Sequence, residues 1–459
     1  QFLNHTQRYV RNCANLVTFR NLVDRFDLDN HPDDFELAYL AVDDVLPTDV
    51  HQAMFVPTLD ALTSPQQRVH FLPLAKSCRI LGGYVQTELG HGSNVRGIET
   101  TATYDPVTQT FDVHSPSPTS TKWWPGALGR TATHCVLYAR LLISGRDYGV
   151  HGFIVQLRSL DDHTPLPGVV TGDIGPKVGF NSLDNGFARF DHVKVPRQNM
   201  LAAFTEVLPD GTYRVRKGRT PDEATRLLYG TMLKVRVTLV RRAHLALARV
   251  CTIAVRYSAV RLQGYRPGTD ESQEWAVLNY PTQYVPLTSF VALCYALHAV
   301  GDQMTRDYKA YMASPTETGL ADLHASSSGL KAYITYEVAA AMESCRKLCG
   351  GHGYLRSSGL PEPIDNYLAM CTLEGTKEVL EPQLARYLLK HRAALASNAS
   401  HALPAPLAHL ASPRPHTRPP LHDSVDPVVL LSIFESRAVG AVVRLEAEVA
   451  EHVRGGLPP

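Results

Sequence analysis

Glu374 is the side chain of this sequence best suited to act as a general base. It stands between Leu373 and Gly375, after the largely apolar lead-in YLAMC (367–371). Apolar neighbours exclude water from a carboxylate and raise its pKa towards the pH at which it would work as a base. A glutamate before a glycine is more often a solvated helix end. Glu374 therefore gains weight only from the motifs that accompany it.

Three glycines, Gly350, Gly351 and Gly353, follow an apolar helical pattern upstream of Glu374. Residues without a Cβ allow a backbone to approach a bulky group closely. A Gly-Gly pair is also the usual C-cap of a helix. Both interpretations end the helix here and place Glu374 beyond the loop that follows.

Two further motifs, QTELGHG (86–92) and TKWWPGALG (121–129), lie far upstream. Together with CGGHGY (349–354) and the Glu374–Gly375 pair they closely resemble the acyl-CoA oxidases, flavoenzymes with the fold of the acyl-CoA dehydrogenases. The resemblance runs in unbroken order from about Cys78 to Lys390. The first two motifs are typical of oxidases, whereas CGGHGY is shared with the dehydrogenases.

The resemblance implies that FAD is held in an extended pose between a β-domain and a helical bundle, with Thr87 and Gly126 among its contacts. Thr87 offers a hydroxyl and a backbone N–H, and Gly126 lets the main chain come close. Trp123 and Trp124 are candidate flavin neighbours. Adjacent residues of a strand point to opposite faces, so only one of these two can meet the flavin.

Gly350, Gly351 and Gly353 match the segment that approaches the cofactor of the neighbouring subunit in this superfamily. The resemblance therefore implies a homodimer with composite sites.

The implied reaction is the oxidation of acyl-CoA to trans-2-enoyl-CoA, the first step of peroxisomal fatty-acid β-oxidation. Glu374 would remove the α-proton of the acyl thioester while a hydride leaves the β-carbon for the flavin. Dioxygen would then take the electrons and yield hydrogen peroxide. A peroxisomal location follows from the same resemblance, although residues 454–459, RGGLPP, are not a Ser-Lys-Leu address.

The sequence departs from the oxidases just after the base. Thr376, Lys377 and Glu378 stand where an acidic residue, Asn and Thr are usual, and Glu381 and Pro382 interrupt the next helical pattern. Pro382 is expected to be tolerated only if it falls in the first turn of the helix that ends at Lys390, because a proline deeper inside would cost about 3 kcal/mol. Two alternatives stay open: a dehydrogenase that passes electrons to a protein, and a flavin-binding or interaction paralogue without catalysis.

Composition excludes several other classes of function. The 45 basic and 44 acidic residues give a net charge of +1, which offers no electrostatic case for binding nucleic acid. The eight cysteines form no CxxC pair, so Cys345 and Cys349 are expected to pack in a core and no metal site is expected. No phosphate-binding loop and no GxGxxG after a strand is found, and no apolar run reaches the length of a membrane span.

The element pattern predicts an α+β chain in five parts. Residues 1–77 would form a helical N-terminal domain, and residues 78–220 a mainly antiparallel β-domain with its clearest hairpin at 104–113. A bundle of antiparallel helices would occupy residues 221–396 and carry Glu374.

The end of the sequence is rich in Pro, His, Ala and Ser over residues 397–427 and is predicted to be a linker without regular structure. Its histidines, His401, His409, His416 and His422, are expected to be solvated. Residues 428–459 would begin a C-terminal helical domain. Because the resemblance implies longer regions at both ends, the chain is expected to be truncated at both.

Overall fold

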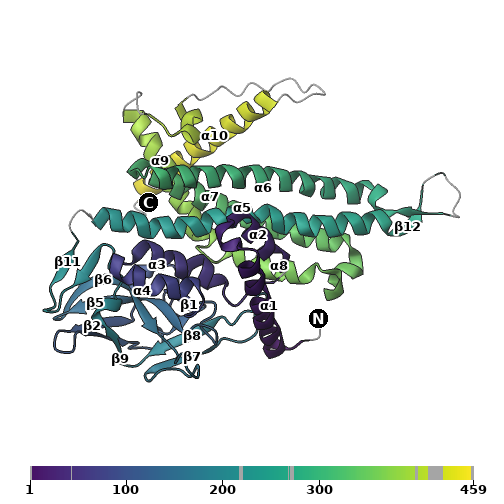
Figure 1. Cartoon of the computed structure of the whole chain (residues 1–459). Helices are drawn as coiled ribbons and strands as arrows, with labels where there is room; N and C mark the ends of the chain where they lie inside the picture. The colour runs from purple at the N-terminus through teal and green to yellow at the C-terminus, as the bar shows by residue number, and fades with distance from the viewer. Residues whose placement is uncertain are drawn as a thin grey trace.

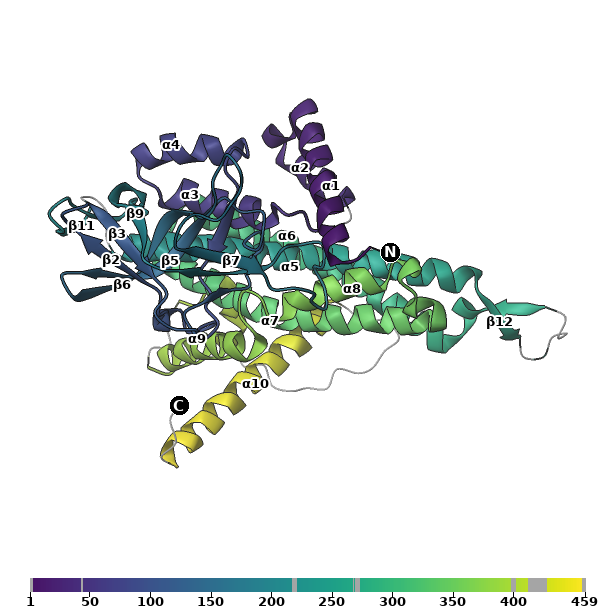
Figure 2. The same ribbon diagram turned by 90° about the horizontal axis from the view of Figure 1, so that it is seen from below.

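The computed structural model describes residues 3–42, 44–216, 221–266, 268, 273–397, 402–411 and 427–455. N-terminal helices lie beside a layer of β-sheets, and a set of long helices crosses over both (Figure 1). Seen from below, helix α10 projects away from the long helices (Figure 2). The α+β class expected from the sequence is confirmed by this arrangement.

Helices fill the first 76 residues: α1 (His5–Arg25), α2 (Pro32–Ala41), α3 (Val56–Leu62) and α4 (Pro65–Lys76). Helices α1 and α4 begin with capping boxes at Asn4 and Ser64. In each, the side-chain oxygen of the capping residue accepts the backbone N–H of the glutamine three residues later, and the side chain of that glutamine accepts the backbone N–H of the capping residue. A π-turn (His51–Phe55) leads into α3. Its Phe55 packs with α3, α4 and one face of the main sheet.

The main sheet has six strands: β1 (Gly82–Val85), β2 (Thr101–Asp105), β3 (Thr110–His114), β5 (His134–Ile143), β6 (Arg146–Gln156) and β9 (Val193–Pro196). The expected hairpin is confirmed, since β2 and β3 pair antiparallel. β1 and β2 pair parallel with β5, so the sheet is mixed where the sequence predicted a mainly antiparallel one. Two parallel partners can share one edge of β5 because that strand is ten residues long.

A second, three-stranded sheet has the order β4 (Lys122–Trp123), β8 (Gly186–Phe190) and β7 (Val169–Asp173). Apolar side chains from both sheets form one core, which includes Leu137 of β5 and Phe190 of β8. A short hairpin, β10 (Thr205–Val207) with β11 (Tyr213–Val215), leads towards the helices.

The helical bundle consists of α5 (Pro221–Val260), α6 (Pro281–Ala313), α7 (Glu317–Leu348), α8 (Pro361–Leu368) and α9 (Lys377–Ser397). Helix α5 is forty residues long and begins at the first residue of the stretch that the sequence predicts to be a helical bundle. Leu247 of α5, Leu297 of α6 and Val338 of α7 meet in the bundle core. A hairpin of β12 (Leu262–Tyr265) and β13 (Glu274–Ala276) lies between α5 and α6.

Helix α6 corrects one expectation. It is long and apolar enough, by length and composition alone, to cross a membrane, with a mean hydropathy of 1.4 over its best window. Its Leu287, Leu297 and Met304 are buried in the bundle core, whereas only 22% of that apolar window is buried. This one helix is weak evidence for a membrane protein.

The stretch predicted to be a linker contains a regular element. A 3-10 helix, η9 (Ala405–Ala411), buries Leu407 and Leu410 against Val439 and Val442 of α10 (Pro427–Arg454). The prediction of no regular structure was therefore wrong for these residues, because two leucines three positions apart find an apolar partner. His409 is half-buried there, and His401, His416 and His422 lie outside the described residues.

All eight cysteines are free thiols. Cys345 and Cys349 are buried in the bundle core, which confirms that they pack as small apolar side chains.

The shared core of the two sheets predicts a large cost for Leu137→Ala. Leu137 is fully buried, so removal of its side chain should lower the free energy of unfolding by about 2–5 kcal/mol and lower Tm. Val107→Ala is the control, because Val107 is 90% exposed and should change stability by less than about 0.5 kcal/mol. Thermal unfolding followed by circular dichroism decides, and equal Tm values for the two variants would contradict the described core.

Candidate active site

The two upstream motifs lie side by side. The Trp123 N–H donates to the Thr87 carbonyl at 3.0 Å, and the Leu89 N–H donates to the Thr121 carbonyl at 2.8 Å. Glu88 and Lys122 form the bridge between the two stretches. Thr87 and Trp123 are therefore neighbours although 36 residues separate them in sequence.

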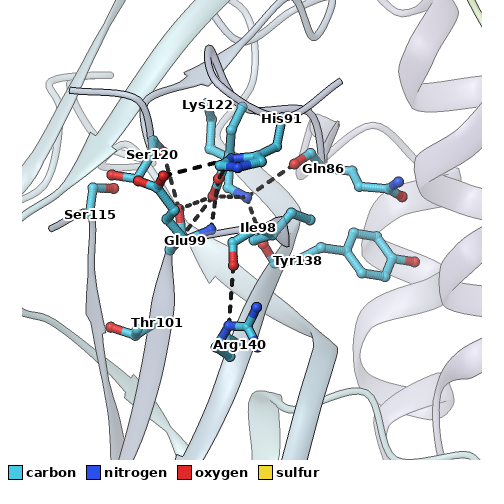
Figure 3. A network of polar contacts seen from close by, with 12 residues as sticks. Gln86, His91, Ile98, Glu99, Thr101, Ser115, Ser120, Lys122, Tyr138 and Arg140 are labelled. Atoms are coloured by element: carbon cyan, nitrogen blue, oxygen red, sulfur yellow. Dashed lines mark hydrogen bonds and ion pairs between the residues drawn. The ribbon is translucent and has the colours of Figure 1, made fainter. Parts of the chain in front are cut away.

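A buried ion pair lies between these motifs. Lys122 Nζ is 3.0 Å from Glu88 Oε1, and both side chains are fully buried. Lys122 also donates to the carbonyls of Gln86, at 3.1 Å, and Tyr138, at 2.7 Å (Figure 3). The pair thus joins the loop after β1 to β4 and to the central strand β5.

Hydrogen bonds complete the surroundings of Glu88. Its carboxylate accepts the N–H groups of Glu99 and Thr100, at 2.8 and 2.9 Å, and the Thr100 hydroxyl at 2.6 Å. Burial alone would raise the pKa of Glu88, but Lys122 and these donors bring it below its ordinary value. Burial lowers the pKa of Lys122 to about 8 against the opposing effect of Glu88. A buried pair of this kind is stable only because its remaining donors and acceptors are also satisfied.

Glu88 and Lys122 were not among the residues predicted from the sequence. Each is adjacent to a residue singled out as a site candidate, Thr87 or Trp123, in an extended stretch where neighbours point to opposite sides. The signal in the sequence was the alternation of side-chain directions along each stretch. It would place the opposite charges of Glu88 and Lys122 on the inward side of the two stretches.

The Trp pair is split between two environments. Trp123 stacks on Phe187 of β8, with ring centroids 5.7 Å apart. Trp124 is 57% exposed and has a φ of +89°, a conformation that costs energy for a residue with a side chain. This geometry leaves an aromatic surface of Trp124 uncovered beside Thr87 and Trp123.

Gly126 is closely packed. A Cβ added there would lie 2.8 Å from Val50 Cγ2 and 3.1 Å from Leu183 Cδ2. Its carbonyl oxygen faces Gly83 of β1. The lack of a side chain at Gly126 is therefore required by protein neighbours, and a substitution there would disturb packing as well as any bound cofactor.

Glu374 lies on a tight turn between the 3-10 helix η8 (Ala369–Cys371) and α9. The Leu373 N–H donates to the Ala369 carbonyl at 3.0 Å, after which Glu374 has a φ of +57° and Gly375 a φ of +106°. Glutamate rarely adopts this left-handed conformation, and such residues persist where their surroundings fix them. The strained backbone conformation is therefore at Glu374, the residue predicted from the sequence to be the base.

Two cations of the bundle approach this turn. Arg236 of α5 donates from Nε to the Glu374 carbonyl at 3.2 Å, and Lys331 of α7 donates to the Gly375 carbonyl at 2.5 Å. Burial raises the pKa of Glu374, while Arg236 and Lys331 lower it to a lesser extent. The net upward shift agrees with the expectation from its apolar neighbours.

Glu374 faces the β-sheet layer through Tyr84 of β1. Burial, Tyr138 and the Glu374 carboxylate raise the pKa of Tyr84, in that order, so the phenol and the carboxylate are within electrostatic range. Tyr84 is three residues before Thr87 in the same extended stretch. The candidate base is therefore within electrostatic range of the stretch that leads into the QTELGHG motif.

Gly350, Gly351 and Gly353 are not part of this assembly. They follow Leu348, the last residue of α7, which lies 17 residues beyond Lys331, a rise of about 26 Å along the helix. A Cβ at Gly350 or Gly351 would meet nothing within 4 Å, whereas a Cβ at Gly353 would clash with the Arg346 carbonyl. The first two glycines therefore face open space, and Gly353 is needed for the end of the helix.

The departures after Glu374 form the start of α9. The Thr376 carbonyl accepts the N–H groups of Val379 and Leu380. Glu378 and Glu381 are exposed, and Lys377 pairs with Glu381 at 3.6 Å. Pro382 is the sixth residue of α9, in its second turn, so the expectation of a first-turn proline was wrong. Because α9 already begins at Lys377, Pro382 falls in its second turn, and the helix continues beyond the proline to Ser397.

One group outside the site has metal-ligand residue types. His114, Asp191 and His192 lie close enough to share a cation. The two imidazoles are stacked, with centroids 4.2 Å apart, and His192 bonds Asp112, which also pairs with Lys194 at 3.0 Å. The ammonium beside this group opposes a bound cation.

The buried Glu88–Lys122 pair predicts that Lys122→Met is strongly destabilising. It leaves Glu88 buried without its cation, which should cost about 3–5 kcal/mol, and adding Glu88→Gln should recover part of the loss. Lys194→Met is the control, because Lys194 makes only a solvent-exposed pair. Thermal unfolding of the four proteins tests this, and a Tm for Lys122→Met equal to that of Lys194→Met would rule out the structural role of the pair.

Comparison with known proteins adds the family. The model for the acyl-CoA oxidase C-alpha1 domain matches residues 229–389, and the model for the acyl-coenzyme A oxidase N-terminal domain matches residues 1–81. Peroxisomal acyl-coenzyme A oxidase 1 of Arabidopsis thaliana is 46% identical over 406 residues, 86% of this chain and 60% of the relative. The human protein of that name is 42% identical over 399 residues, 85% of this chain and 58% of the relative.

Solved structures agree with the sequence matches. Acyl-CoA oxidase 1 of Arabidopsis thaliana superposes with a TM-score of 0.90 at 39% identity, over 98% of this chain and 68% of that chain. Acyl-CoA oxidase-1 of Caenorhabditis elegans gives a TM-score of 0.89 at 33% identity, over 99% and 67%. The chain spans about three fifths of the length of the curated relatives. With these matches and the site geometry together, the chain belongs to the acyl-CoA oxidase family.

Proposed function

We propose that this chain is an FAD-dependent acyl-CoA oxidase. The observation that carries the proposal is the position of Glu374, a carboxylate of raised pKa on a strained turn, within electrostatic range of Tyr84 in the stretch that leads into QTELGHG. A carboxylate held in this way suits the abstraction of a weakly acidic proton. The substrate would be an acyl-CoA and the product trans-2-enoyl-CoA, as in the first step of peroxisomal fatty-acid β-oxidation.

The residues around Thr87 fit a flavin. Within the described residues, the Thr87 N–H and hydroxyl donate to no protein group, while its carbonyl is bonded to Trp123. The exposed ring of Trp124 offers an apolar surface nearby. The Caenorhabditis elegans acyl-CoA oxidase-1 structure is a complex with FAD and ATP, which supports the same cofactor here. Bound FAD would accept the hydride from the β-carbon and pass the electrons to dioxygen, giving hydrogen peroxide.

The chain's own part in the reaction is the proton. Glu374 must be ionised to take the α-proton, and its half-buried position raises its pKa towards the value of an effective base. Acyl-CoA oxidase-2 of Caenorhabditis elegans was solved with FAD, ascaroside-CoA and ATP, and this CoA ligand supports a CoA thioester as the substrate class. A peroxisomal location is proposed from the names of the curated relatives.

The glycines after α7 support a homodimer. Gly350 and Gly351 face open space and follow the end of α7, which is about 26 Å along that helix from Lys331 at the Glu374 turn, so they suit a partner's site and not their own. A second copy of this chain would supply the bulky group that these glycines accommodate.

Glu374→Gln should abolish the chemical step and spare binding. The amide keeps the size of the side chain but removes the base, so flavin reduction should slow by about a hundredfold or more. Glu374 acts as the carboxylate, and burial raises its pKa. The rate of flavin reduction in the wild type should therefore rise as the pH passes through that pKa. The variant has no carboxylate at this position, so its rate should not show this rise. Anaerobic stopped-flow reduction by acyl-CoA measures both.

The control is Glu378→Gln, four residues away and exposed to solvent. It should keep the rate and the pH limb of the wild type. Reduction of Glu374→Gln at the wild-type rate would refute the assignment.

Gly351→Val should affect a dimer and not a monomer. Within one chain the added side chain meets nothing, so circular dichroism should show an intact fold, while the partner's site should bind less FAD. Sedimentation equilibrium with flavin absorbance per chain measures assembly and cofactor together. A fully active, flavin-loaded monomer would contradict the composite site.

A further inference from the structure

Lys331 is a fully buried lysine without a hydrogen-bonded counter-charge. No carboxylate of the described residues lies within ion-pair distance of its Nζ, unlike Lys122, which pairs with Glu88. Burying an ammonium costs several kcal/mol unless other groups compensate it. A cation in this position therefore needs a reason beyond packing.

Its contacts supply that reason. Lys331 Nζ donates to the Cys371 carbonyl at 3.1 Å and to the Gly375 carbonyl at 2.5 Å. These two carbonyls mark the entry and the exit of the turn that contains Glu374. One ammonium thus joins both ends of a five-residue segment whose fourth residue is held at a φ of +57°.

The rest of α7 makes Lys331 a rigid support. The Thr335 hydroxyl donates to the Lys331 carbonyl at 2.9 Å, and the Cys371 thiol lies 3.5 Å from the Thr335 carbonyl. Ile334 and Val338, on the same side of the helix, are buried in the bundle core. The ammonium is therefore fixed relative to the bundle, and the turn is fixed relative to the ammonium.

We propose that Lys331 is a positioning residue for Glu374, in that it clamps the two ends of the turn and places a cation within electrostatic range of the carboxylate. The proposal rests on the proposed acyl-CoA oxidation for its catalytic consequence. The clamp itself is a property of the folded chain.

The electrostatic consequence has a definite sign. Burial raises the pKa of Glu374, and Arg236 and Lys331 oppose it. Arg236 of α5, Tyr84 of β1, and Cys371 of the turn also face this region, while His324 of α7 lies beside Arg236. Burial lowers the pKa of Lys331 to about 8, so it is charged at neutral pH. Loss of this cation should raise the pKa of Glu374 and move the onset of catalysis to higher pH.

Lys331→Met tests both parts in the full-length chain, because methionine is unbranched and suits a buried site but has no donor and no charge. The midpoint of the rising limb in anaerobic flavin reduction should move up by about one pH unit, so that the rate at a fixed pH well below the midpoint falls by about tenfold. Amide hydrogen exchange of residues 371–376 should accelerate by at least about tenfold, while that of β5 stays unchanged.

Two further variants keep the test decisive. Val338→Ala removes a buried side chain of the same helix without touching the turn, so it should lower Tm but change neither the midpoint nor the exchange of the turn. Lys331→Gln retains amide donors without the charge, and replaces Lys331→Met if that variant does not fold. It should move the midpoint in the same direction.

The outcomes separate the two proposals. Unchanged exchange in the turn of the Lys331 variant would overturn the clamp whatever the activity. An unchanged midpoint in a chain that does reduce its flavin would overturn the electrostatic role. If the parent chain reduces no flavin, the proposed function fails, and hydrogen exchange alone still decides the clamp.

Discussion

The rest of this structure depends on one constraint. The carboxylate of Glu374 is held partly out of water, where the helical bundle meets the β-sheet layer. Burial raises the pKa of Glu374 above its ordinary value. Arg236 and Lys331 oppose this shift, and each also bonds a backbone carbonyl of the turn. Their charges therefore moderate the pKa of Glu374.

The same arrangement recurs on the other side of the site. Lys122 bonds the carbonyls of Gln86 and Tyr138 and pairs with Glu88, so that buried charge fixes the backbone beside Thr87 and Trp123. The long helices α5 and α7 pack against each other in one apolar core, which fixes their positions. Arg236 of α5 and Lys331 of α7 are therefore held beside the Glu374 turn. The β-layer meets the bundle directly as well, since the Phe180 N–H donates to Asn366 of α8 at 2.6 Å. Both halves of the site are thus held by side chains that bond backbone groups.

Much of this organisation could be predicted from the sequence. The motifs located Glu374, Thr87 and the Trp pair, and periodicity located the long helices. Arg236 and Lys331 were missed, although each falls on the apolar stripe of its helix, at the spacing of buried Leu233 and Val240 or of Ile334 and Val338. A basic residue among the apolar residues of a helix face was the feature of the sequence that could have identified both. The parallel pairing of β1 and β2 with β5 had no local signal, because it depends on partners distant in sequence. The helix η9 was hidden by the prolines around two leucines.

The central claim is that Glu374 and the Thr87–Trp123 motifs form one flavin-dependent site. The most direct test is the visible absorption spectrum of the purified chain after incubation with FAD, recorded without oxygen before and after addition of acyl-CoA. The account predicts a yellow protein that loses its flavin absorbance with acyl-CoA and regains it with dioxygen, releasing hydrogen peroxide. A folded protein that takes up no FAD, or a bound flavin that no acyl-CoA reduces, would contradict it.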